Sequence, residues 1–95
     1  MIYQPASSVM NQLVARAEAV TGIEAGSLRA RARETLICHV RFAVMALARE
    51  RGLGLARIAK GLGGRDHSTI ISGLKRAEAL RADPDFAKLL EAIAK

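Results

Sequence analysis

The sequence is short of aromatic residues and of cysteine. Its 95 residues include no tryptophan, one tyrosine and two phenylalanines, so aromatic residues make up only 3% of the chain. Because 51% of the residues are hydrophobic, the core must be built from alanine, leucine, isoleucine, valine and methionine, a composition that favours helices over strands. The single cysteine, Cys38, excludes an internal disulfide framework and a multi-cysteine zinc site in this chain.

Long hydrophobic runs and targeting signals are also missing. No apolar run reaches the ~18 residues that a membrane span needs. The segment 1–12 has no basic region followed by an apolar stretch, so it does not have the pattern of a signal peptide. Together with an unpaired cysteine, these features lead us to expect a single cytoplasmic domain over residues 1–95 without membrane contact. The length leaves no room for a multidomain enzyme.

Positive charge is concentrated in the middle of the chain. The net charge is +6, and eleven of the 15 basic residues are arginine. Residues 29–76 hold eleven basic and three acidic residues and so carry +8, whereas 1–28 and 77–95 each carry −1. A localised basic field on a small domain indicates a polyanionic partner such as nucleic acid, although an arginine-rich surface can also serve solubility alone.

Apolar residues recur at helical spacing along nearly the whole chain and predict an all-α bundle of about five helices. The expected helices run from an N-cap at Ser7 or Ser8 to Gly22, and then over residues 36–51, 55–62, 66–81 and 85–94. The longest carries its inward stripe at Leu36, Val40, Ala43, Val44, Leu47 and Ala48. The alternating stretch 29–33 is interpreted as a loop or a frayed helix start, because a lone strand would have no partner.

Two of these segments, 55–62 and 66–81, have the arrangement of a helix-turn-helix, with Gly63 and Gly64 in the turn. The second segment begins with polar residues, has Asp66 in position to cap it, and becomes apolar on one face only later. A recognition helix needs this pattern, since its N-terminal end faces base edges while its body is anchored in the core. An ordinary pair of antiparallel helices would give the same spacing.

The segment 63–70, GGRDHSTI, resembles the signature of the C-terminal DNA-binding domain (domain IV) of the bacterial replication initiator DnaA. Residues 41–50 and 55–80 are similar to the long helix and the helix-turn-helix of that domain, and the resemblance covers about residues 9–81. It implies a Trp-repressor-like bundle that binds double-stranded DNA as a monomer at DnaA-box-like sites. The chain has no GxxxxGK[ST] phosphate loop, so we expect no bound nucleotide. We also expect no other cofactor and no metal.

The resemblance also implies which residues face the DNA. Those that would read bases in the major groove are Arg65, Asp66, His67, Ser68 and Thr69. Their side chains suit the task, because Asp can accept from cytosine, His can donate to a base acceptor and a Thr methyl can contact thymine. For Asp66, helix capping is an equal alternative, since phosphates repel an acidic group.

Further contacts are implied outside the recognition helix. Arg33, with Arg31 beside it, would enter the minor groove, where an A·T-rich sequence concentrates negative potential. Arg29 would contact a phosphate, or would enter the groove in place of Arg33 or Arg31. The remaining phosphate contacts would come from Arg41, Leu55, Ala56, Lys75 and Arg76. Leu55 and Ala56 would act through exposed backbone N–H groups at a helix start.

These expectations point to a nucleoid-associated DNA-binding protein that regulates replication initiation, by competing with the initiator for its boxes, or transcription. The alternative is a protein-interaction module that keeps the fold and contacts replication proteins without specific DNA binding. We expect no enzymatic activity, because the consecutive residues Asp66, His67 and Ser68 diverge by about 100° on a helix and cannot line up as a catalytic set. The side chains of Cys38 and His39 diverge in the same way, so this pair is a poor metal site.

Overall fold

The computed structural model describes residues 6–95, and the side chains from Val9 onward. It contains five helices, α1 (Ala6–Thr21), α2 (Thr35–Glu50), α3 (Leu55–Gly61), α4 (His67–Leu80) and α5 (Pro84–Ala94), and within this range no strand. The prediction of a small all-α bundle is therefore confirmed. The Arg-rich stretch 29–33 lies in the long connection between α1 and α2, as a loop.

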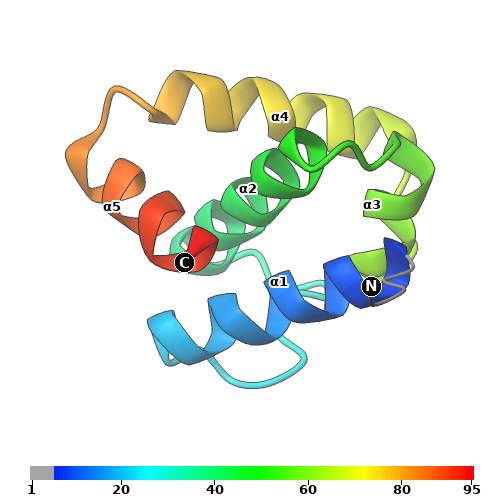
Figure 1. The fold of residues 1–95 in the computed structure, drawn as a ribbon, viewed down its shortest axis with the longest axis horizontal. Helices are drawn as coiled ribbons and strands as arrows, with labels where there is room; N and C mark the ends of the chain where they lie inside the picture. The colour runs from blue at the N-terminus through cyan, green and yellow to red at the C-terminus, as the bar shows by residue number, and fades with distance from the viewer. Residues whose placement is uncertain (1–5) are drawn as a thin grey trace, which may run out of the picture.

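Helix α2 is the centre of the bundle. It packs against each of the other four helices, and Figure 1 shows it passing between α1 on one side and α4 on the other. Nine of its sixteen residues are buried, which is more than a single inward stripe would account for. The predicted stripe is correct except at Leu36, which is 54% exposed, while Ile37 is buried in its place. Met45 and Ala46, outside the stripe, are buried because α2 has neighbours on several sides.

Two helix ends show the local chemistry that the sequence indicates, and one differs from the prediction. Helix α1 ends at Gly22, whose φ of +73° is the left-handed conformation that glycine adopts most easily. Helix α5 begins with Pro84 after Asp83, whose carboxylate accepts a hydrogen bond from the Asp85 N–H at 2.8 Å, as an N-cap does. The exception is the start of α1, which lies at Ala6, so the predicted cap at Ser7 or Ser8 is wrong. The side chains of these two serines lie outside the described residues.

The turn between α3 and α4 packs against the backbone of the Arg-rich loop. Gly63 and Gly64 both have positive φ, +91° and +79°. A Cβ atom at Gly63 would overlap the carbonyl oxygen of Arg29, so glycine is required there for two reasons, conformation and space. The helix-turn-helix is thus positioned directly beside the loop.

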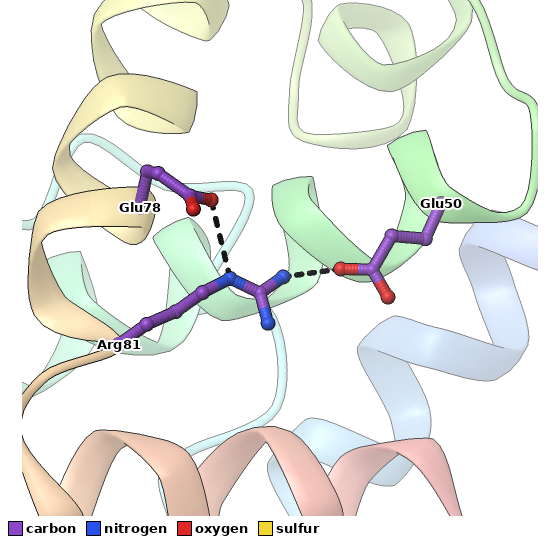
Figure 2. Close-up of polar contacts among 3 residues, drawn as sticks. All are labelled: Glu50, Glu78 and Arg81. Carbon is purple, nitrogen blue, oxygen red and sulfur yellow. Dashed lines mark hydrogen bonds and ion pairs between the residues drawn. The ribbon is translucent and has the colours of Figure 1, made fainter.

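The far ends of α2 and α4 are joined by an ion-pair network. The Arg81 guanidinium, just after α4, lies between the carboxylates of Glu50 and Glu78 (Figure 2). All three side chains are substantially exposed, so the network contributes little to stability, about 1 kcal/mol or less for each pair. None of the helices in the described range is both long and apolar enough to cross a membrane.

Candidate nucleic-acid interface

The N-terminal end of α4 presents a polar, exposed surface. His67, Ser68 and Thr69 form its first turn and are all exposed, while Ile70 directly after them is fully buried. Asp66 occupies the N-cap position with φ −70° and ψ 152°, but its side chain makes no capping hydrogen bond. The position predicted for Asp66 is therefore correct, whereas the capping bond is absent, and its exposed carboxylate stays available to a donor from outside.

Arg41, in the N-terminal half of α2, is buried and organises the Arg-rich loop. Its side chain is 6% exposed. Its Nε–H donates to the carbonyl of Leu28 at 2.9 Å, one terminal nitrogen donates to Ala32 at 2.6 Å, and the other donates to Ser27 at 3.1 Å and to Ala30 at 2.6 Å. Four loop carbonyls thus converge on one guanidinium, whose planar fork of five donors suits this arrangement.

This placement differs from the phosphate contact expected for Arg41. A buried guanidinium that already donates to four carbonyls is not a surface group, so we assign Arg41 to the architecture of the loop. Burial lowers the pKa of Arg41, and the positive charge of nearby Arg65 lowers it further, while Cys38 has the opposite effect. The hydrogen bonds to the carbonyls compensate the charge for its loss of water. No pattern in the sequence indicates this role, because the acceptors are backbone atoms.

Arg65 connects the turn of the helix-turn-helix to the same loop. Its Nε–H donates to the Leu62 carbonyl at 3.0 Å, and a terminal nitrogen donates to the Ala30 carbonyl at 2.5 Å. Arg65 and Arg41 therefore share the Ala30 oxygen. Arg65, which was expected to read a base, is half-buried and joins the turn to the Arg-rich loop. It also lines the pocket described next.

A polar pocket brings some of the residues expected at the major and minor grooves to one place, although His67 and Ser68 do not line it. Arg31 and Arg33 of the loop line it from one side, and Arg65, Asp66 and Thr69 line it from the other. Arg31 and Arg33 are exposed, and neither makes a hydrogen bond or ion pair with any residue that the structure describes. The pocket thus joins free cations to the polar end of α4. We call this surface, made by residues 31–33 and 65–69, the recognition surface.

The residues expected to contact phosphate lie at two other places. At the start of α3, Gly54 is the N-cap and offers no side-chain bond, so backbone N–H groups of Leu55 and Ala56 have no partner within the helix. Ala56 is exposed and Leu55 is half-buried. On α4, Lys75 and Arg76 are both exposed, and the Arg76 guanidinium lies 5.8 Å from the centre of the Phe42 ring, a cation–π contact that orients it.

Arg29 has a structural role that the sequence did not predict. Its Nε–H donates to the Gly61 carbonyl at 3.1 Å and a terminal nitrogen donates to Asn11 Oδ1 at 2.9 Å. It thereby joins the loop to α3 and to α1. Its partners lie 18 and 32 positions away along the chain, so no local pattern could have revealed them.

Comparison with protein families matches residues 10–77 to the family described as the bacterial DnaA protein helix-turn-helix. The chain belongs to this family. The match runs from α1 through the Arg-rich loop to the buried part of α4, and so includes the whole recognition surface; α5 lies beyond it. Comparison with curated proteins finds no match. Membership of the DnaA helix-turn-helix family indicates that the chain binds double-stranded DNA.

Proposed function

We propose that the protein binds double-stranded DNA sequence-specifically, at sites similar to the DnaA box. The observation that carries this proposal is the pocket that the loop arginines share with Asp66 and Thr69 at the start of α4. A recognition helix reads base edges in the major groove through its N-terminal residues, while an arginine on an adjacent loop reads the narrow minor groove. Both kinds of group lie on one surface here. Hydrogen bonds of Arg41 fix the loop to α2, and the hydrogen bond from Arg65 to the Ala30 carbonyl joins the loop to the turn before α4.

In this proposal each part of the surface has a separate task. His67, Ser68 and Thr69 contact base edges, with Asp66 able to accept from cytosine. Arg33 and Arg31 enter the minor groove. The backbone N–H groups at the start of α3, together with Lys75 and Arg76, hold phosphates and set the position of the helix without reading sequence.

The biological role that we propose is competition for these sites. A DnaA-type DNA-binding domain that occupies DnaA boxes would compete with an initiator for them, and so repress initiation, or would regulate transcription from such boxes. It would act in the cytoplasm, on the nucleoid, as a monomer on DNA, with no catalytic step.

The test is fluorescence anisotropy with two labelled duplexes, one with a DnaA box and one with the same bases scrambled, each at two salt concentrations. We expect tight binding that prefers the box at both concentrations, with log K falling against log[salt] at a slope of about −4 to −8. Equal and salt-sensitive binding to both duplexes would refute sequence-specific recognition. Absence of binding even at low salt would favour a protein-interaction module instead.

A further inference from the structure

A second group of cations lies beside the recognition surface, on the outer face of α3. Arg57 and Lys60 are three positions apart on this helix and so project from the same face. Together with Arg29 they line a pocket between α1 and α3, whose other residues are Met10, Asn11 and Gly61. No acidic side chain lines this pocket.

The cations of this pocket have no anionic partner in the described part of the chain. Both ion pairs found there involve Arg81, at the other end of α4. Arg57 and Lys60 are exposed and make no side-chain hydrogen bond with described residues. Like charges three positions apart on a helix repel each other, so the cluster costs stability unless an anion compensates it. An arrangement of this kind indicates a ligand with negative charge.

The position of Arg29 in this pocket is fixed. Two of its five donors are used by the Gly61 carbonyl and by Asn11, and the remaining ones stay free. The floor of the pocket is tightly packed, since a Cβ atom at Gly61 would come within 2.7 Å of the Met10 side chain. A rigid guanidinium between two flexible cationic side chains is suited to bind the oxygens of a phosphodiester.

The pocket is continuous with the recognition surface. Arg29 lines both pockets, and the turn glycine Gly63 packs on its backbone. A duplex held at the recognition surface therefore passes close to Arg29. The backbone of a longer duplex can extend from Arg29 along this second pocket, which Arg57 and Lys60 line on α3.

We propose that Arg57, Lys60 and Arg29 form a second phosphate-binding site, which holds the DNA backbone on one flank of the box. This inference rests on the proposed function and adds to it a longer footprint and a preferred side. The site carries no base specificity, because cationic side chains that contact only phosphates strengthen binding equally for all sequences. The chain is asymmetric, so one bound copy uses only one flank.

The experiment compares three duplexes, which carry the box alone, the box extended on one side, and the box extended on the other. Wild-type protein is compared with Arg57→Gln/Lys60→Gln, and the matched control is Arg16→Gln/Lys88→Gln, which removes the same charge from exposed positions on α1 and α5. Binding is measured by anisotropy over a salt series. Urea unfolding of each variant checks the fold, and no midpoint should fall, because all four side chains are exposed. The midpoint of the Arg57→Gln/Lys60→Gln variant should rise slightly, because the repulsion between the two cations is removed.

We expect the slope of log K against log[salt] to be steeper for the wild type on one extended duplex than on the box alone, by about 2, corresponding to two further phosphates. The Arg57→Gln/Lys60→Gln variant should lose this difference, and the control should keep it. The charge-conserving variant Arg57→Lys should behave as the wild type.

Three results would overturn the inference while leaving the proposed function intact: equal slopes for the double variant and the wild type on every duplex, equal losses in the double variant and the control, or an equal gain from either extension. Failure of the wild type to prefer the box over a scrambled duplex would instead refute the proposed function, and the inference with it.

Discussion

Replacing Arg41 tests whether this residue holds the Arg-rich loop in place or contacts a phosphate of the DNA. The structure gives it four hydrogen bonds to loop carbonyls. Hydrogen bonds to a charged group contribute about 1.5–3 kcal/mol each. The four share one guanidinium, however, and the carbonyls can bind water once the loop moves. We therefore expect Arg41→Met to lower the free energy of unfolding by about 3–4 kcal/mol, well below the sum of the four bonds.

The domain should survive this loss. A chain of this length has a stability of about 5–14 kcal/mol, so the variant remains folded while the loop becomes mobile. Ordering even one loop residue on binding then costs about 1–2 kcal/mol, and we expect the affinity for a box duplex to fall at least about tenfold. Urea unfolding, anisotropy and limited trypsin digestion measure the three effects, the last because Arg31 and Arg33 are cleavage sites in the exposed loop.

The conservative change Arg41→Lys provides the decisive comparison. A lysine keeps the charge but concentrates its three donors on one atom, so it cannot reach four separated carbonyls. If Arg41 holds the loop, the lysine variant should lose at least half as much stability as the methionine variant and be cut faster by trypsin than the wild type. A lysine variant with wild-type affinity, salt slope and digestion rate would refute our assignment and restore Arg41 as a phosphate contact.

Other changes test individual positions. His67→Ala should weaken binding to a box duplex by ~1–3 kcal/mol and binding to random DNA much less; equal losses in anisotropy would remove it from the base-reading residues. Lys75→Ala should weaken binding to both duplexes alike and reduce the salt slope by about 1, and a loss confined to the box duplex would contradict a phosphate role. Gly63→Ala should lower the free energy of unfolding in urea by about 2 kcal/mol or more, because the methyl group meets the Arg29 carbonyl and φ is positive; an unchanged free energy of unfolding would contradict this packing. Arg81→Ala should cost about 1 kcal/mol or less, since its two ion pairs are exposed, and a larger shift in thermal unfolding would show that the network matters more than its exposure suggests.

The sequence by itself was sufficient to predict the helices and the helix-turn-helix. Apolar spacing is a local property, and the ends of α2, α3, α4 and α5 lie within one or two residues of those predicted. The GGRDHSTI signature also pointed to the family that the comparison confirms. Local patterns failed where neighbours decide burial, as at Leu36 and Ile37, because a helix surrounded on several sides buries more than the face that its own periodicity defines.

Only the tertiary structure decided which arginines are free. In sequence, Arg29, Arg31, Arg33, Arg41 and Arg65 are equivalent cations, each able to meet a phosphate or a base. In the fold, Arg41, Arg65 and Arg29 donate to backbone carbonyls of other segments, whereas Arg31 and Arg33 have no hydrogen-bond partner among the described residues and line the pocket. The physical reason is that a carbonyl acceptor belongs to the backbone of every residue and leaves no mark on residue identity. Which carbonyls converge on one guanidinium is settled only when the helices pack.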